Sequence, residues 1–276
     1  MKTRFLRSAA ALPMLFAGPA MAAPPAPAYN WSGFYLGANA GGAWASSNAN
    51  TTVNCSPTTN PPAYICEPTR GGANAALVSA AASGGIAASA FTGGIEAGYN
   101  WQQSNLIYGW ETDFDSFNLR ASRQARGVLG PGSPEPSAGT VFTAGSSFST
   151  DMLYTLRGRV GMAFSPGWMG FITGGLALTS FRVSNFYNDS FAAPPGGVEN
   201  SSTNSARAGW TVGGGLEWAI ANHWSVKAEY LYLNFGKITT TGFISNNNAA
   251  AGYAQGLSTS SDLTANIARA GINYKF

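Results

Sequence analysis

Apolar side chains alternate with small or polar ones along most of the chain beyond residue 30, and this two-residue period limits the fold more than any other feature. In the first such segment Phe34, Leu36 and Trp44 share one face, whereas Tyr35 and Asn39 lie on the other. Successive side chains of a β-strand point to opposite faces, so the pattern predicts strands rather than helices. Eight segments repeat it, and they are residues 31–44, 91–101, 106–115, 152–164, 168–182, 207–220, 224–232 and 268–276.

The connections between these segments alternate in length. Three are tight enough for hairpin turns, namely residues 103–104, 165–167 and 221–223. Four are long and rich in Gly, Ser, Asn, Thr and Pro, namely residues 46–88, 118–147, 183–206 and 237–262. Short turns at one end and long loops at the other are typical of outer-membrane barrels. We therefore predict an all-β fold, an eight-stranded antiparallel up-and-down transmembrane β-barrel with short periplasmic turns and long extracellular loops.

A soluble antiparallel sandwich or a lipocalin-like barrel alternates in the same way, and periodicity alone does not say which face meets water. Three features favour the membrane barrel. They are the secretion signal described next, the alternation of connection lengths, and the apolar residues Ile272, Tyr274 and Phe276 at alternate positions of the last strand. In the fifth segment Phe171 falls opposite Ile172, so the register of that strand stays open.

The N-terminus has the three parts of a secretory signal peptide. A basic start is followed by the mostly apolar residues 9–18 and by a small-x-small pattern that ends at Ala22, so cleavage is expected after Ala22 or after Ala23. A retained anchor helix is the alternative, but the apolar stretch is short and is interrupted by Pro13. We therefore expect export to the outer membrane of a Gram-negative cell and three parts: a signal peptide 1–22, a Pro/Ala-rich periplasmic leader 23–30 and an outer-membrane barrel 31–276.

Composition excludes several classes of protein. Only 10% of the residues are charged, whereas a soluble globular domain carries about a quarter. The formal charge of +3 belongs to the three basic residues of the signal, so the mature protein is neutral and lacks the basic surface that nucleic-acid binding requires. No apolar run approaches the ~20 residues of a spanning helix, which excludes a polytopic helical membrane protein.

Charged residues recur on the polar faces at similar distances from the short turns. At about 3.3 Å per residue and a tilt near 40°, six residues climb roughly 15 Å, which is mid-bilayer. A charge there has to face the lumen and find a partner. Because the interior of an eight-stranded barrel is just wide enough for side chains, we predict an ion-pair layer that plugs it, with a hydrated, conducting layer as the alternative. The predicted members are Glu96, Glu111, Arg157, Arg159, Glu229 and Arg269.

Residues that would support catalysis or metal binding are scarce. The single histidine, His223, lies in a predicted periplasmic turn, away from the long-loop rim where an outer-membrane enzyme places its base. One histidine and two cysteines offer no metal-ligand spacing, so we expect no enzymatic activity, no metal and no cofactor. Cys55 and Cys66 share the first long loop in an oxidising compartment, and a disulfide is the expected state, with two reactive thiols as the alternative.

Two further loop segments are predicted. Arg120, Arg123 and Arg126 begin the second long loop, where they either contact lipopolysaccharide phosphates or stay solvated at the loop base. The Ala-, Gly- and Ser-rich stretch 71–90 is predicted to be part of the first loop.

Three segments, Asn30–Gly37, Trp224–Tyr232 and Ala270–Phe276, carry a family resemblance. They are similar to strands of the small alphaproteobacterial outer-membrane β-barrel proteins, a group of major surface antigens and porin-family proteins related to the OmpA transmembrane domain. The resemblance covers nearly all of the mature chain. It implies that the barrel assembly machinery reads Tyr274 and Phe276, with Ile272 at the preceding alternate position.

The resemblance specifies a fold rather than an activity. The first functional hypothesis is a structural protein that maintains envelope integrity and presents loops at the surface. A narrow porin for small solutes, and a loop-mediated receptor or adhesin such as the haemin-binding relatives, are the alternatives. The expected partners are outer-membrane lipid, lipopolysaccharide and the assembly machinery, and no nucleic acid.

Overall fold

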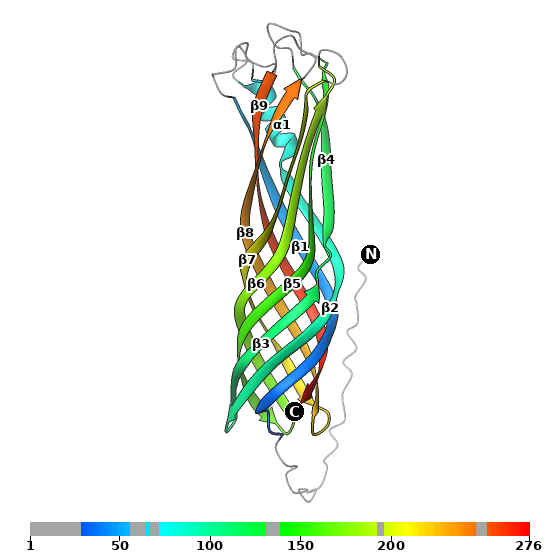
Figure 1. Cartoon of the computed structure of the whole chain (residues 1–276). Helices are drawn as coiled ribbons and strands as arrows, with labels where there is room; N and C mark the ends of the chain where they lie inside the picture. Colours follow the sequence, from blue (N-terminus) through cyan, green and yellow to red (C-terminus); the bar gives the residue numbers. More distant parts are fainter. Residues whose placement is uncertain (1–28, 56–64, 67–71, 131–138, 192–195, 247–252) are drawn as a thin grey trace, which may run out of the picture.

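The computed structural model describes residues 29–55, 65–66, 72–130, 139–191, 196–246 and 253–276. The predicted signal peptide, its cleavage positions and residues 23–28 of the leader lie outside these ranges. Within them, antiparallel strands wrap into one tall barrel with a short helix at its upper end (Figure 1). The elements are β1 (Gly33–Asn54), α1 (Ala73–Ala82), β2 (Gly84–Gln103), β3 (Leu106–Ser116), β4 (Arg120–Val128), β5 (Val141–Ser165), β6 (Trp168–Asp189), β7 (Val198–Ala219), β8 (Trp224–Asn246) and β9 (Tyr253–Lys275).

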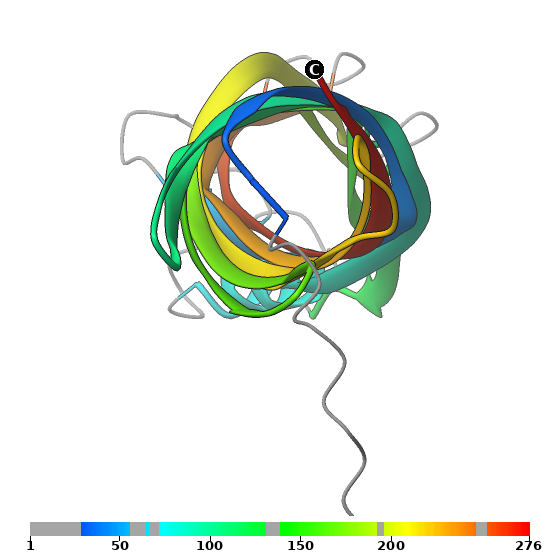
Figure 2. The ribbon, with the colours of Figure 1, turned by 90° about the horizontal axis from the view of Figure 1, so that it is seen from below.

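The described strands occupy eight positions in the ring, as predicted. Each strand pairs with its neighbour in sequence except that β3 does not pair with β4. The pairing of β1 with β9 and that of β3 with β5 close the barrel (Figure 2). The β4 strand pairs with β5 above β3, so β3 and β4 together occupy one position. The fold is therefore an antiparallel up-and-down barrel.

The long connections are shorter in the structure than the sequence analysis expects. Residues 46–54, predicted as loop, continue β1 and pair with β9, and β5, β6, β7 and β8 are extended in the same way. These extensions are rich in Ser, Asn and Thr, with alanine and scattered large apolar residues between them. That pattern has little hydropathic contrast and much turn-forming composition, which conceals a strand.

Halfway up the barrel, the apolar residues change from the outward face of the wall to the inward face. In the lower half the outward positions are apolar, from Phe34 to Trp44 on β1, over the ~9–11 residues that a tilted strand needs to cross a bilayer. Above Trp44 the outward positions of β1 become polar, beginning with Ser46 and Asn48, while Ala43 and Ala45 turn inward and are buried. We call the lower outward face the apolar band. Its most exposed members include Phe91, Ile95, Ile172 and Leu176.

The upper half is filled by apolar side chains, as in a water-soluble protein. One buried cluster includes Phe117, Phe148, Phe181 and Phe235, and a second, nearer the upper end, contains Val78 of α1 and Ile65. The helix corrects the prediction of loop for residues 71–90, since residues 73–82 form α1 and residues 84–90 begin β2. Among the described residues, no helix has the length and apolar character needed to cross a membrane.

Candidate functional site

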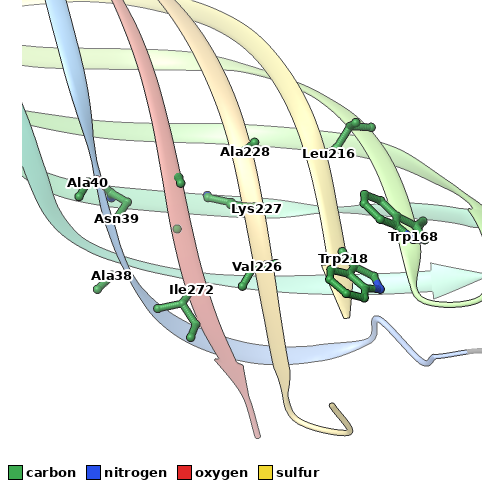
Figure 3. Close-up of a pocket in the computed structure, with 12 residues that line it drawn as sticks. Ala38, Asn39, Ala40, Trp168, Leu216, Trp218, Val226, Lys227, Ala228 and Ile272 are labelled. Carbon is green, nitrogen blue, oxygen red and sulfur yellow. The ribbon is translucent and has the colours of Figure 1, made fainter. Parts of the chain in front are cut away.

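A shallow groove of about 710 Å³ crosses the outer wall where β7, β8, β9 and β1 lie side by side (Figure 3). The small residues Ala38, Ala228 and Ala270 are part of its lining. Trp168 and Trp218 lie together at one side of it. Nearly all of the lining is apolar, and the groove lies within the apolar band. It therefore offers lipid-facing surface and no set of polar groups for chemistry.

The polar chemistry is concentrated inside the lower half of the barrel. Strand alternation turns charged side chains of six strands inward, and each is at most 4% exposed. We call this set the charged layer. Its members are the acids Glu96 of β2, Glu111, Asp113 and Asp115 of β3, Glu217 of β7 and Glu229 of β8, and the bases Arg157 and Arg159 of β5, Lys227 of β8 and Arg269 of β9.

All six residues predicted for the layer lie in it, but four more belong to it. Asp113, Asp115, Glu217 and Lys227 were on the polar faces in the sequence, at heights that the count from the turns left out. The count took charges six or seven residues from the short turns, together with Arg157 two residues higher, and so left out Glu217 and Lys227 nearer the turns and the two aspartates further away. Long guanidinium and ammonium side chains reach partners two positions higher or lower along a strand, about 6.6 Å away, so the real layer is thicker.

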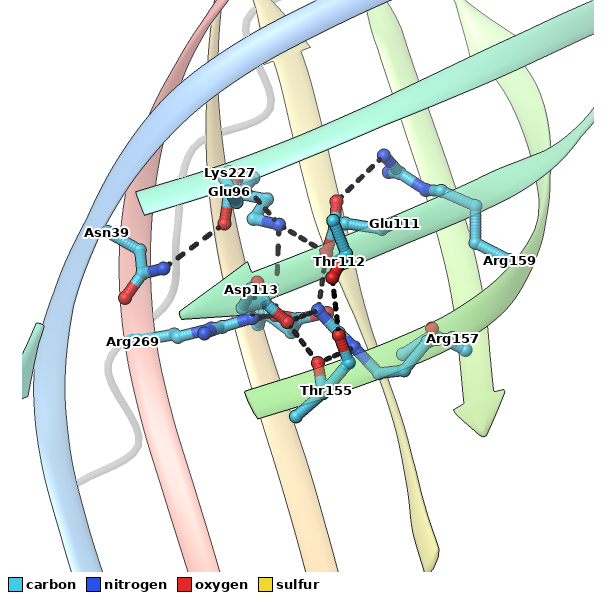
Figure 4. A network of polar contacts seen from close by, with 12 residues as sticks. Asn39, Glu96, Glu111, Thr112, Asp113, Thr155, Arg157, Arg159, Lys227 and Arg269 are labelled. Atoms are coloured by element: carbon cyan, nitrogen blue, oxygen red, sulfur yellow. Dashed lines mark hydrogen bonds and ion pairs between the residues drawn. The ribbon is translucent and has the colours of Figure 1, made fainter. Parts of the chain in front are cut away.

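Arg157 is at the centre of the layer (Figure 4). Its Nη1 lies 2.6 Å from Glu229 Oε1, and its Nη2 lies 2.7 Å from Asp113 Oδ2 and also donates to Glu111. The nearby Thr155 hydroxyl accepts a hydrogen bond from Arg157 Nε. One guanidinium therefore joins β5 to carboxylates of β3 and β8.

Arg269 makes a second hub. Its Nη2 lies 2.7 Å from both Asp113 Oδ1 and Glu229 Oε2, and its Nη1 lies 2.8 Å from Asp115 Oδ2. Since Asp113 and Glu229 are shared with Arg157, the two guanidiniums and their acids form one continuous network.

Lys227 spans the lumen. Its Nζ lies 2.8 Å from Glu111 Oε1 and 2.9 Å from Glu96 Oε1. Lys227 belongs to β8 and Glu111 to β3, which are four positions apart in the ring of eight and thus diametrically opposite. Carboxylate oxygens of three acids, Glu96, Glu111 and Asp113, lie within 4.8 Å of one another. The positive charge beside them comes from Lys227 and Arg157.

Tyr35 and Arg159 extend the network toward the periplasmic end. Tyr35 Oη donates to Glu111 Oε2 over 2.7 Å, and Arg159 Nη2 lies 2.6 Å from Glu217 Oε2. The Arg159 guanidinium also covers the ring of Phe171 at 4.1 Å. Gly98 faces Tyr35, and a Cβ there would collide with the phenol, so the glycine makes room for this contact.

Aromatic residues cover the lower mouth of the barrel. The chain before β1 crosses that mouth (Figure 2), and Trp31 is buried there with Ile107 and Met169. Tyr29 packs edge-on against Trp31 at 4.7 Å, and the Lys275 ammonium lies 4.5 Å from the centre of the Tyr29 ring. Burial, assisted by the negative charge of Glu217, raises the pKa of Tyr29 to about 12.

The remaining predicted residues lie away from the layer. Cys55 and Cys66 are joined by a disulfide near the upper end. His223 lies in the turn between β7 and β8, where its ring stacks on Tyr274 and its Nδ1 lies 2.8 Å from the Lys275 carbonyl oxygen. Ile272, Tyr274 and Phe276 are on the last strand or just beyond it, beside β1 and β8.

The three predicted loop arginines lie on β4, not in a loop. Arg120 and Arg126 are exposed on the outer wall. Arg123 points the other way and donates to the carbonyl oxygen of Ala81 at the end of α1, over 2.9 Å. The alternation of a strand separates residues that look like one basic cluster in the sequence.

Sequence comparison identifies the family. Residues 8–276 match the model of the outer membrane protein beta-barrel domain. The chain belongs to this family. Its membership, together with the apolar band, places the protein in the Gram-negative outer membrane, and its relatives there are alphaproteobacterial.

Two named relatives illustrate the range of similarity within this family. The 31 kDa outer-membrane immunogenic protein of Brucella melitensis is 34% identical over 55% of this chain, and the match spans only 57% of that relative. The 25 kDa outer-membrane immunogenic protein of Brucella abortus is 24% identical over 86% of this chain and 85% of its own length. The solved structure of OprG from Pseudomonas aeruginosa is 10% identical, covers 90% of this chain and 99% of its own, and gives a TM-score of 0.42.

Proposed function

We propose that the protein is a closed structural barrel that contributes to envelope integrity and presents its upper end at the cell surface. The contact between Lys227 and Glu111 carries the proposal, because it joins opposite walls of the barrel at the height of the bilayer. The aromatic lower mouth and the two apolar clusters above the layer supply further closures. The relatives' name, outer-membrane immunogenic protein, supports exposure at the surface.

The layer's composition favours one second candidate, a narrow pore for cations. Its described members are six acids and four bases, a formal excess of two negative charges. If water entered the layer, that excess would attract cations. Removing one partner of a buried, hydrogen-bonded ion pair costs several kcal/mol of stability, so the ion pairs of the layer should keep their geometry. We therefore prefer the closed barrel.

Planar-bilayer recording distinguishes the two candidates. The mature protein is refolded in detergent, heat-modifiable gel migration establishes that the barrel has formed, and a trimeric porin in the same bilayer serves as the positive control. We expect no channel openings at any voltage. Steady openings whose conductance rises with salt and whose reversal potential is cation-selective would overturn the closed barrel in favour of the pore.

Two further proposals accompany this function. We propose that the protein has no enzymatic activity, since its one histidine is engaged with Tyr274 and Lys275 at the short-turn end. We also propose that the assembly machinery recognises Ile272, Tyr274 and Phe276. Ile272 and Phe276 are 43% and 66% exposed on the outer face, which leaves them accessible to a partner.

A further inference from the structure

A polar hollow of about 360 Å³ lies on the outer wall, over β4, β5 and β6. Arg120 of β4 and Arg182 of β6 both pair in register with Ser149 of β5, so the two arginines flank that serine from opposite sides. Neighbouring strands are about 4.8 Å apart, which places the two arginine backbones within about 10 Å of each other. The other hydroxyls that line the hollow belong to Ser122, Ser147 and Ser184.

The hollow lies at a defined depth. Tyr154 of β5 and Leu178 of β6, which pair with each other, are exposed members of the apolar band. One outward row, with Met152 of β5 and Ser180 of β6, separates them from the row that contains Arg120, Ser149 and Arg182. The hollow therefore lies about 13 Å along the strand above the Leu178 row of the band. This is the depth at which lipid headgroups meet the protein.

The charge at this depth is positive. Arg120 lies 3.9 Å from the Asp151 carboxylate, and both side chains are more than half exposed, so this contact holds the arginine weakly. Arg182 makes no ion pair within the part of the chain that the structure describes. Two guanidiniums with one peripheral acid leave a net positive site, and the other polar residues that line the hollow are serines.

We propose that this hollow binds the phosphate-bearing sugar headgroup of an outer-leaflet glycolipid. Arginine donates to phosphate through two parallel N–H groups, and the four serine hydroxyls suit the remaining phosphate and sugar oxygens. The depth favours a headgroup whose acyl chains lie along the apolar band, one outward row below the hollow. The inference rests on the proposed function in one respect, because an outer-leaflet lipid reaches the hollow only if the upper end of the barrel faces the cell surface.

Binding of a defined glycolipid tests the proposal. The refolded full barrel, in phosphate-free detergent micelles, is titrated with diphosphoryl lipid A and with the same lipid after removal of both phosphates, and binding is read by native mass spectrometry. We expect the phosphorylated lipid to bind at least tenfold more tightly. The double variant Arg120→Gln with Arg182→Gln should abolish that preference.

A second double variant controls for charge. Arg126→Gln with Lys237→Gln removes two exposed positive charges from the outer wall outside the hollow, and we expect it to alter binding less than twofold. Equal binding of the two lipids, or equal loss in both double variants, would overturn the site. Competition by inorganic phosphate with the affinity of the lipid would overturn the assignment to a glycolipid in favour of free phosphate.

The closing measurement separates this inference from the proposed function. The preparation that is used for binding is also recorded in a planar bilayer. Channel openings with retained lipid preference would refute the closed barrel and leave the hollow intact, whereas silence without lipid preference would refute the hollow alone.

Discussion

Arg157 is fully buried and contacts three carboxylates, so its loss should be costly. Replacing it by leucine leaves Glu111, Asp113 and Glu229 with less compensation, and removing one partner of a buried ion pair costs about 3–5 kcal/mol. We expect Arg157→Leu to lower the free energy of unfolding in urea by about that amount.

The control for this change is Arg126→Leu on the outer wall, where the side chain is exposed and a change of about 0.5 kcal/mol or less is expected. Both variants are compared by urea titration in the same micelles, with heat-modifiable gel migration as an independent readout. Equal stability of the two variants would show that the layer is not structural.

The apolar band predicts that the same substitution changes stability differently at two equally exposed residues. Ile95 and Phe243 are each 66% exposed, but Ile95 lies within the band and Phe243 in the polar upper half. Arginine facing lipid near the bilayer midplane costs about 2–4 kcal/mol. We therefore expect Ile95→Arg to destabilise the folded barrel in lipid vesicles by that amount and Phe243→Arg to be nearly neutral. A similar loss of folding free energy at both positions would mean that the apolar band does not lie where we place it.

Tyr29 predicts a pH effect at the lower mouth. Its raised pKa means that folding favours the neutral phenol, so its contribution to stability is fully present below pH 10 and is lost as the pH rises through about 12. The phenolate absorbance of the wild type minus that of Tyr29→Phe should titrate near pH 12. A midpoint near 10 in that difference would mean that Tyr29 is not packed against Trp31.

Counting residues along each strand from its short turn identified the members of the charged layer that lie six or seven residues from a turn, together with Arg157. It missed the other members of the layer. The acids Glu96 and Glu111 are at similar heights, so the count identified them. Lys227 lies nearer its turn than Glu229, and the count excluded it, yet its four-carbon side chain reaches Glu96. The length of a side chain, which a count of backbone positions ignores, decides membership.

At the scale of the element, α1 tests whether the upper apolar cluster holds the mouth closed. Val78 is fully buried and its neighbour Leu77 is 41% exposed, so the two positions form a matched pair. Val78→Asp places an unpaired carboxylate among apolar side chains and should release the helix, whereas Leu77→Asp should leave it bound. Hydrogen exchange of the α1 amides measures the difference, and equal protection in both variants would contradict the packing.

The sequence of α1 also shows what a periodicity analysis misses. Six of its ten residues are alanine, the strongest helix former, but they give the segment no apolar face and it was predicted as loop. Propensity would have found this helix where the hydrophobic pattern did not. The strand extensions are different, because Ser and Asn, which are frequent in them, have little intrinsic preference for strands, and pairing with neighbouring strands decides their structure.

At the scale of the molecule, the polar upper half should stand clear of the bilayer on one side only. The outward residues of β1 above the band run from Ser46 to Asn54, which lies about 33 Å along the strand beyond Trp44. At a tilt near 40° this is a height of about 25 Å above the band. Atomic-force imaging of the protein in supported bilayers should therefore find protrusions of about this height on one face. Equal heights on both faces would mean that the upper half is not external.

The exchange of polarity near Trp44 also restricts vertical movement in the membrane. A shift of one alternate pair, about 6.6 Å along the strands, would either draw hydroxyl and amide groups into hydrocarbon or lift apolar rings into water, on most strands at once. Because the barrel cannot adjust its depth, we expect the surrounding lipid to adjust its thickness instead. Barrels whose bands have equal heights would then share the same deformed annulus and gather in patches without any direct contact between them.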